Sequence, residues 1–420
     1  MGKIVGNFTR VGVVCCFLVT ALLAVTPFTA LAGDTIKIGH LDPHSGFMKI
    51  VGDQAKEMWS ILLEEVNAKG GVLGKKVEVI FEDNEYRPEV AVRKAKKLIL
   101  QDKVDFIASG VGSHIAIALN RVATANKKIY FNFGGITDAI QGKFFTRYAF
   151  RMCHNVHQVA AIHVWHMAQK PYRKFYIICP DYVFGHDYAR AIKEMVKKVM
   201  PDAKIVGEDY HPIGTKDFAP YVTKIIASGA DAIVSGNFYT DSLLFIKTVR
   251  EMGLKAPFPI FAFEAVNGNV SQALGDQVVG ISESGPYLFE LDTPRNNAYV
   301  KKWHEKNKHK AWQWWWTPRG NASWEYMGWQ MIFAAIEKAG STDPEKFIPV
   351  FEGFRYKTIL DWWEMRACDH QILLPEYAYE FAVGKNKWYD FNWIGEKTIV
   401  RIPAEKLALP ATPDYNPRCK

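Results

Sequence analysis

The sequence lacks the short motifs that mark several common classes of enzyme and metal protein. It has no G-x-S-x-G, Walker or G-x-G-x-x-G pattern, and it has no C-x-x-C pair. These absences argue against a serine hydrolase, a nucleotide-binding loop and a cysteine-based zinc site. We therefore expect no catalytic centre, no cofactor and no metal site, and we expect that the protein is not an enzyme.

A cluster of histidines is the one feature that invites a metal interpretation. It consists of His154, His157, His163 and His166. Successive residues of a helix are rotated by about 100°, so these four side chains project in different directions. A single four-ligand site is therefore not expected, and a weak site at an i, i+3 pair is the lesser alternative.

Long apolar runs are also scarce, and the notable one lies near the N-terminus. Two basic residues precede an apolar stretch at 11–23, and Ala-Leu-Ala at 30–32 lies just before Gly33. This order is typical of a secretory signal peptide. A membrane anchor is the weaker alternative, because a spanning helix needs about 20 apolar residues. We expect residues 1–32 to be a cleaved signal peptide and the mature chain not to span a membrane.

Length and charge limit the number of domains and the kinds of partner expected for the mature chain. Removal of residues 1–32 leaves 388 of the 420 residues, which suits two domains of about 100–200 residues each. The net charge is +8, and the basic residues are spread along amphipathic helices without a nucleic-acid-binding motif. No nucleic-acid partner is therefore expected.

Cysteine is rare in the mature chain, which would keep Cys153, Cys179, Cys368 and Cys419. An even number in an exported protein permits disulfides, and four cysteines allow three pairings. The sequence alone does not choose among them. We favour Cys368–Cys419, which would tie down an extended C-terminal tail.

Strand and helix patterns alternate along the chain in two successive sets. The first set has strands expected at 35–39, 76–82, 104–109 and 128–133, with helices at 53–68, 88–101 and 113–126. The second has strands at 174–179, 204–210, 232–235 and 259–263, with helices at 157–168, 189–199, 218–228 and 241–252. Such alternation indicates β-α-β units and parallel sheets. We predict two doubly wound α/β lobes that bind a ligand beyond the carboxyl ends of their strands.

Several motifs occur in an order that resembles one known family. They are Ile36-Lys-Ile-Gly39 with Ser45-Gly46, the segment Glu65 to Gly74, Glu82-Asp-Asn-Glu85, Asp181-Tyr-Val-Phe-Gly185, Thr215-Lys-Asp-Phe218, Phe263-Glu264, and the segment Arg366 to Gln371. Together they resemble the periplasmic binding proteins of the leucine/isoleucine/valine type, also called type I solute-binding proteins. The resemblance covers essentially the whole mature chain.

The resemblance implies two Rossmann-like lobes joined by three crossovers. Lobe 1 would comprise residues 33–149 plus 286–371, and lobe 2 would comprise residues 150–285 plus 372–420, with the C-terminal tail. It also implies a periplasmic protein that captures a small molecule, namely an amino acid, an amide or an aromatic or hydrophobic acid. The membrane permease of an ABC importer would be its partner. A ligand sensor of the same fold, which signals to a membrane receptor, is the alternative.

The resemblance also predicts which residues contact the solute. In lobe 1 these are Ser45, Phe47, Gly112, Ser113, His114, Gly135, Ile136 and Trp324. In lobe 2 they are Phe184, Phe238, Tyr239 and Glu264. Adjacent glycines at 134–135 suit either an anion or a tight turn. Glu264 suits a cationic or hydrogen-bond-donating group, because a buried carboxylate needs a partner. An acid bonded to nearby backbone at the strand end is the equal alternative. Aromatic residues make up 14% of the chain and favour a flat or apolar solute portion, although most tryptophans are expected to serve packing.

Overall fold

The computed structural model describes residues 1–2, 35–263, 270, 273–310, 317–318, 320–385, 388, 392–396 and 400–420. Their strands form three sheets, two of which are built from β-α repeats. Among the described residues, no helix combines the length and the apolarity needed to cross a bilayer. The predicted α/β class with two doubly wound sheets is confirmed.

The first sheet has five parallel strands in the order β2-β1-β3-β4-β5. These are β1 (Ile36–Asp42), β2 (Val77–Asp83), β3 (Phe106–Ser109), β4 (Ile129–Asn132) and β5 (Ala149–Arg151). The helices that alternate with them are α1 (Lys49–Ala68), α2 (Pro88–Leu100) and α3 (Ser113–Ala125). β3 and β4 are buried along their whole length, as expected for parallel strands covered on both faces.

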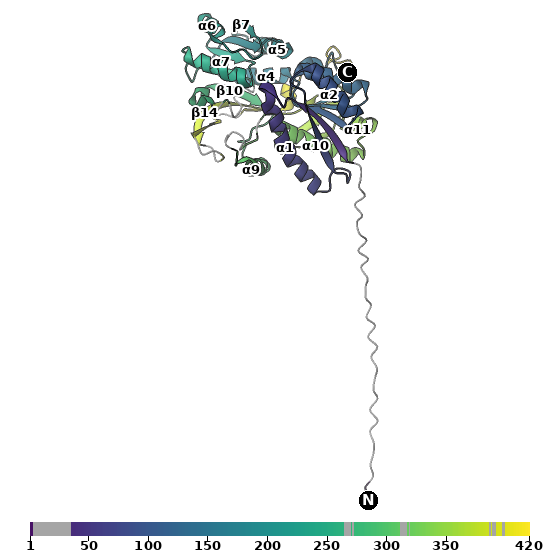
Figure 1. Ribbon diagram of the computed structural model, residues 1–420. Coiled ribbons are helices and arrows are strands. Elements are labelled where there is room, and N and C mark those ends of the chain that lie inside the picture. The colour runs from purple at the N-terminus through teal and green to yellow at the C-terminus, as the bar shows by residue number, and fades with distance from the viewer. Residues whose placement is uncertain are drawn as a thin grey trace. The chain divides into compact units, whose positions relative to one another are not determined.

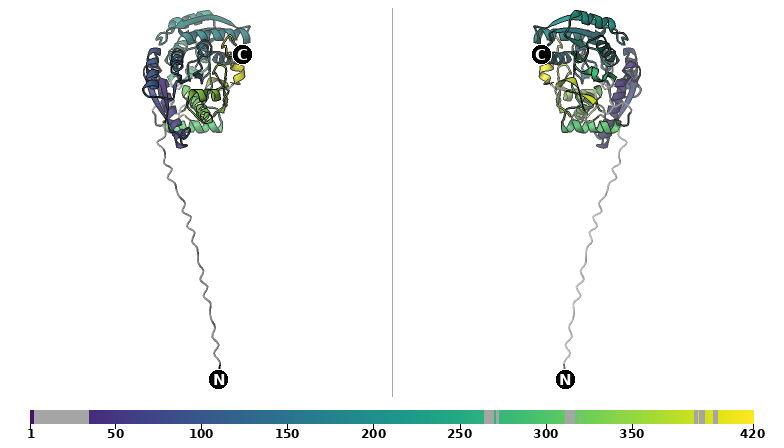
Figure 2. Two further views of the ribbon diagram at one scale, coloured as in Figure 1. Left: turned by 90° about the vertical axis from the view of Figure 1, so that its right-hand side faces the viewer. Right: turned by 90° about the vertical axis from the view of Figure 1, so that its left-hand side faces the viewer.

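The second sheet follows the order β15-β14-β10-β9-β8-β6-β7, and β16 pairs with β14. Its strands are β6 (Lys174–Pro180), β7 (Lys204–His211), β8 (Ala232–Ser235), β9 (Ile260–Ala262), β10 (Ile281–Gly285), β14 (Glu376–Lys385), β15 (Asn392–Glu396) and β16 (Val400–Ile402). Its helices are α4 (Val156–Met167), α5 (Val183–Val199), α6 (Ala219–Ser228) and α7 (Tyr239–Glu251). The teal helices α5, α6 and α7 gather beside β7, away from α10 and α11 (Figures 1 and 2).

The remaining elements lie mainly between β10 and β14 in the chain. They are α9 (Pro294–Asn307), α10 (Asn321–Ala339), α11 (Pro344–Phe351) and an antiparallel sheet of β11 (Arg355–Lys357), β12 (Trp362–Met365) and β13 (Ile372–Leu373). Short helices complete the chain: η1 (Gly46–Met48), η2 (Asp138–Ile140), η3 (Gly275–Val278) and α12 (Ala404–Leu407).

Aromatic packing attaches α10 to the first sheet. The Trp329 ring lies 4.9 Å from that of Trp59 on α1 and 5.4 Å from that of Phe131 on β4. Trp329, Trp59 and Phe131 are at most 1% exposed. α10 is therefore part of the core of the first sheet although almost 170 residues, on the order of a whole domain, separate it from β5.

Two expected helix starts were wrong in detail. The helix expected from residue 189 begins at Val183, and the helix expected from residue 53 begins at Lys49. Gly185 lies in the first turn of α5, where a Cβ atom would meet the Pro180 carbonyl oxygen at 1.9 Å. A glycine in that turn signals close packing against β6, not a loop. The antiparallel strands β14 to β16 were not anticipated at all.

The connection between the two sheets is stabilised by a buried arginine. Arg151, at the end of β5, donates from Nε to Gln371 Oε1 at 2.5 Å and from Nη1 to the Thr137 carbonyl at 2.7 Å. Its backbone N–H donates to the His370 carbonyl. Arg151 and Gln371 are both fully buried. The segments near residues 148–151 and 371–376 therefore run side by side.

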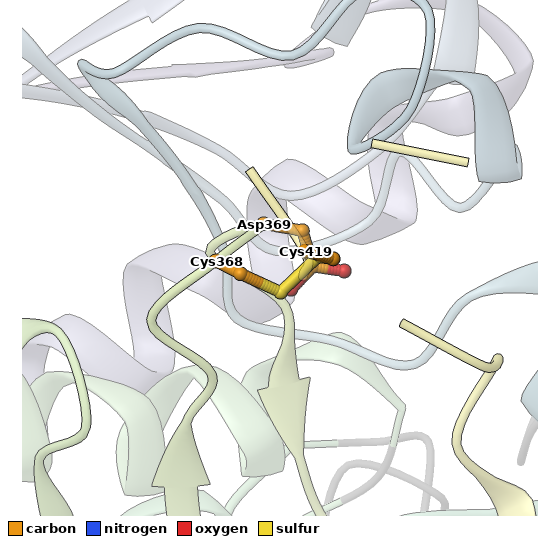
Figure 3. Close-up of side chains that lie close together, drawn as sticks. All are labelled: Cys368, Asp369 and Cys419. Carbon is orange, nitrogen blue, oxygen red and sulfur yellow. A yellow bond between two sulfur atoms is a disulfide. The ribbon is translucent and has the colours of Figure 1, made fainter. Parts of the chain in front are cut away.

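The C-terminal tail is covalently attached. Cys368 and Cys419 form a disulfide with a Cα–Cα distance of 5.0 Å, and Asp369 lies beside it (Figure 3). Further along the tail, Asn416 donates to the Gln141 carbonyl at 2.8 Å and Arg418 donates to Glu352 at 2.6 Å. The disulfide is the pairing favoured from the sequence. The last residues of the tail thus lie against segments that were predicted to belong to lobe 1. The predicted lobe division had assigned the tail itself to lobe 2.

Candidate functional site

A pocket lies where loops from the first and second sheets meet, with an empty volume of about 460 Å³. Most of its lining follows the carboxyl ends of parallel strands. The lining residues are Met48, Tyr86, Val111, Gly112, Ser113, Gly134, Ile136, His154, Tyr182, Phe184, Phe238, Tyr239, Phe263, Asn321 and Trp324.

The pocket brings together many of the residues predicted to contact a solute. Those that line it are Gly112, Ser113, Ile136, Phe184, Phe238, Tyr239 and Trp324. Ser45, Phe47, His114 and Gly135 do not line it. Glu264 lies outside the described residues, and so do the tryptophans of segment 312–316. The role of each residue toward a solute stays a prediction.

The residues outside the lining have other contacts. Phe47 is 44% exposed, and its ring meets the Tyr86 ring edge-on at 5.5 Å. The His114 ring packs 4.9 Å from the Tyr86 ring. Ser45 precedes η1. The Gly135 N–H and carbonyl both bond to the side chain of Asn132, which matches the tight-turn alternative for this glycine.

The start of α3 forms the polar end of the pocket. Gly112 is the N-cap with φ of +91°, a backbone conformation that favours glycine. No side chain caps this helix, and Gly112 and Ser113 at its start both line the pocket. Ser113 Oγ accepts hydrogen bonds from the N–H groups of Ile136 and Thr137, each at 3.2 Å. Its own hydroxyl hydrogen therefore remains available to an acceptor.

Aromatic rings from the second sheet form the opposite wall. The Phe184 ring lies 4.9 Å from the Phe263 ring and 6.3 Å from the Phe238 ring. Trp324 contributes from α10, with its indole N–H already donated to the Phe133 carbonyl at 2.8 Å. Because that polar group is satisfied within the protein, Trp324 presents mainly apolar surface. Tyr326, two residues further along α10, instead donates to Glu65 at 2.7 Å and is not part of the lining.

Sequence reasoning missed two tyrosines that join across the pocket. Tyr86 follows β2 and Tyr182 precedes α5, and their hydroxyl groups share a hydrogen bond. Burial raises the pKa of Tyr86 to about 12 and that of Tyr182 well above its usual range. Both phenols are therefore neutral at physiological pH. Tyr86 directly follows the recognised motif Glu82–Glu85, and Tyr182 belongs to the motif Asp181–Gly185. Their positions after β2 and β6 could therefore have identified them.

His154 is another lining residue that was not predicted as a solute contact. Its Nδ1 lies 3.3 Å from a carboxylate oxygen of Glu376, which is fully buried at the start of β14. The rings of Trp324 and Phe263 lie 5.7 and 6.0 Å from the imidazole. Glu376, at the start of β14, thus lies against a residue that lines the pocket. His154 is the first polar residue after β5, and this position beyond a strand end could have identified it.

The cluster of histidines does not converge on one point. His163 is fixed between the Tyr188 hydroxyl, 2.6 Å from Nδ1, and the Ser284 hydroxyl, 2.8 Å from Nε2. Burial lowers the pKa of His163 to about 3, so the imidazole is neutral at physiological pH. Burial also lowers the pKa of His166, to about 4. His166 packs its ring 5.7 Å from that of Phe261 on β9, so both histidines have structural roles in the core of the second sheet.

Comparison with known proteins identifies the family of this chain. The sequence pattern of the periplasmic binding protein family matches residues 35–386. A "Leucine-, isoleucine-, valine-, threonine-, and alanine-binding protein" of Pseudomonas aeruginosa is 26% identical over 350 residues, which cover 80% of this chain and 88% of the relative.

Solved structures show the same fold. A leucine-, isoleucine-, valine-, threonine- and alanine-binding protein from Brucella ovis, in a closed conformation, superposes with a TM-score of 0.80 at 22% identity, covering 90% of this chain and 97% of its own. An ABC-transporter solute-binding protein of R. palustris in complex with 4-hydroxybenzoate gives a TM-score of 0.78 at 24% identity, covering 88% and 98%. The chain belongs to the periplasmic binding protein family, whose members are solute-binding proteins and not enzymes.

Proposed function

We propose that this protein captures a small aromatic carboxylate in the pocket and delivers it to the permease of an ABC importer. The proposal places the carboxylate at the start of α3 and the ring among the aromatic side chains. It also takes residues 1–32 as a cleaved signal peptide, which would release the mature protein into the periplasm. Names of relatives support a small organic solute, since they include binders of branched-chain amino acids and of 4-hydroxybenzoate.

The observation that carries the proposal is the polarity of the pocket. One end is the uncapped start of α3, where Ser113 keeps a hydroxyl hydrogen to donate. Backbone N–H groups and the helix dipole both favour an anion at such a position. Among the described residues that line the pocket there is no acid. An anionic group therefore meets donors there without meeting a like charge.

The rest of the pocket suits a flat apolar body. Phe184, Phe238, Phe263 and Trp324 line it together, and the Phe184, Phe238 and Phe263 rings are at most 8% exposed. Aromatic pairs contribute about 0.5–1.5 kcal/mol beyond the burial of apolar area. Several rings around one solute ring would therefore distinguish an aromatic acid from an aliphatic acid of similar size.

Closure around the solute would use contacts between the two sides of the pocket. Tyr86 and Tyr182 share a hydrogen bond, and Thr137 donates to Asp187 on α5. A solute that adds contacts to both sides shifts the equilibrium toward the closed form, since a ligand shifts populations only by its differential affinity. Glu264, predicted to pair with an ammonium group, would add selectivity if the solute also carries an amine.

Identification of the natural solute tests this proposal. The protein purified from its host would be denatured, and the released compounds would be identified by mass spectrometry. We expect an aromatic carboxylate, and a bound branched-chain amino acid or an amide would overturn the assigned class. Delivery is tested by uptake of the labelled compound into cells with and without the gene; equal uptake by both would contradict a role in import.

A further inference from the structure

A second polar cluster lies in the core of the first sheet, outside the pocket. It consists of His40 and Asp42 on β1 and Glu325 on α10, all of which are fully buried. The His40 ring is flanked by the rings of Trp59 at 6.1 Å and Phe81 at 5.7 Å. The cluster therefore occupies an apolar environment in which uncompensated charge is costly.

Each of the three side chains has one satisfied atom and one atom without a partner. His40 Nε2 lies 3.1 Å from Glu325 Oε2, and Asp42 Oδ1 accepts from the Gly110 N–H at 2.6 Å. The atoms that lack a hydrogen bond are His40 Nδ1, Asp42 Oδ2 and Glu325 Oε1. Buried polar atoms in proteins are nearly always partnered, so three orphans in one cluster indicate a missing partner.

The three residues can offer ligand atoms that lie close to one another. His40 Nδ1 lies 3.6 Å from Asp42 Oδ2, and one ligand atom from each residue can be chosen so that all lie within 4.8 Å of one another. A four-coordinate ion with bonds of about 2.0–2.1 Å holds its ligand atoms roughly 3.3 Å apart. A hydrogen atom of Gly110 faces the same point, since a Cβ there would meet Glu325 Oε1 at 2.5 Å and Asp42 Oδ2 at 2.8 Å.

The charge of the cluster also calls for a cation. Two carboxylates face a single imidazole, and among the described residues His40 is the only basic side chain paired with either acid. A neutral imidazole, two carboxylates and a divalent ion sum to zero.

We propose that His40, Asp42 and Glu325 bind a divalent transition-metal ion, with Zn²⁺ the best match to one imidazole and two carboxylates in a closed core. The ion has a structural role. It ties β1 to α10, and it lies beside the Gly110 backbone, whose carbonyl accepts from the Asn321 side chain. Because Val111, Asn321 and Trp324 line the pocket, the ion would hold that wall of the pocket in place.

Metal analysis of untagged protein tests the proposal without reference to the solute. We expect about one equivalent of zinc by mass spectrometry of the purified protein. After dialysis against a strong chelator, Zn²⁺ at about 100 times its Kd should raise Tm by about 3 °C, while Mg²⁺ should not. Co²⁺ should bind with the same stoichiometry and give a visible absorption band.

Substitutions decide whether these residues hold the ion. D42N and E325Q keep the side-chain shapes and should each lower zinc content at least tenfold and remove the Zn²⁺-dependent rise in Tm. E352Q is the matched control, because Glu352 also pairs with a histidine, His370, but has Arg418 to compensate its charge; its zinc content should stay at about one equivalent.

Two results would overturn the proposal. One is wild-type protein that holds no divalent metal and shows no Zn²⁺-dependent change in Tm, which would mean that protons alone neutralise the cluster. The other is stoichiometric zinc that persists in both D42N and E325Q, which would place the ion elsewhere. Because the wild-type measurements need no variant, a failure of either variant to fold does not block the test.

Discussion

The disulfide between Cys368 and Cys419 gives a stability prediction whose magnitude follows from the structure. The two cysteines are separated by 51 residues in sequence. Closing a loop of that length removes about 14 cal/mol/K from the unfolded chain, or about 4 kcal/mol at 25 °C. The double substitution C368S/C419S should therefore destabilise the protein by up to about 4 kcal/mol.

This loss translates into a measurable change of melting temperature. At about 2.1 cal/mol/K per residue, a mature chain of this length has an unfolding entropy of about 0.8 kcal/mol/K, so Tm should fall by about 5 °C. Scanning calorimetry of wild type and variant measures the change directly. Reduction of the wild type with dithiothreitol should reproduce it, and reduction should leave the variant unchanged.

The affinity of the pocket for its solute provides the control. The C-terminal tail contacts Asp138 and Gln141, but no residue of the tail lines the pocket. Solute affinity of the variant should therefore stay within about twofold of wild type at temperatures well below Tm. A variant with the wild-type Tm would refute the claim that the disulfide restrains the unfolded chain. A variant that folds normally but binds no solute would refute the separation of tail and pocket.

Three further predictions follow from individual side chains. Burial lowers the pKa of His163 to about 3 against about 6.5 when unfolded, so the unfolded state binds more protons between those values and stability should fall as pH drops below 6.5. The free energy of unfolding should be about 2 kcal/mol lower at pH 5 than at pH 8. In urea unfolding, this free energy should depend less on pH in H163Q than in wild type. The same pH dependence in both proteins would contradict the assignment. F184L removes a ring that packs 4.9 Å from Phe263 and should weaken an aromatic acid about tenfold by calorimetry, while an unchanged Kd would place the solute ring elsewhere. Y182F removes the hydroxyl bonded to Tyr86 and should weaken solute binding about fivefold through a less stable closed form; equal affinity would show that the closed form does not depend on this bond.

Much of the fold was predictable because it depends on local patterns. Alternating apolar strands and amphipathic helices predicted the parallel strands of the two main sheets, and the expected strand at 232–235 matches β8. What failed depends on contacts distant in sequence. The early start of α5 follows from how closely Gly185 approaches Pro180, and β14 pairs with β10 about 90 residues earlier, roughly the length of a small domain. The periodicity of neighbouring residues in the sequence does not indicate either contact.

The site shows the same division. Ser113, Phe184 and Trp324 were predicted from the resemblance to the family, and the structure brings them together at the pocket. Tyr86, Tyr182 and His154 were missed because their importance arises from a partner in a distant segment. The His40–Asp42–Glu325 cluster is the clearest example, since β1 and α10 supply residues separated by 285 positions. Sequence spacing cannot reveal such a cluster without the fold.

The central claim is that the pocket binds an aromatic carboxylate through the start of α3. Calorimetric titration of untagged mature protein with 4-hydroxybenzoate and with 4-hydroxybenzamide tests it most directly, because the two compounds differ only in the group placed at Ser113. A charge-assisted hydrogen bond contributes about 1.5–3 kcal/mol, so the acid should bind at least tenfold more tightly than the amide, and S113A should weaken the acid more than the amide. Equal affinities for acid and amide, or binding of neither compound, would contradict the account.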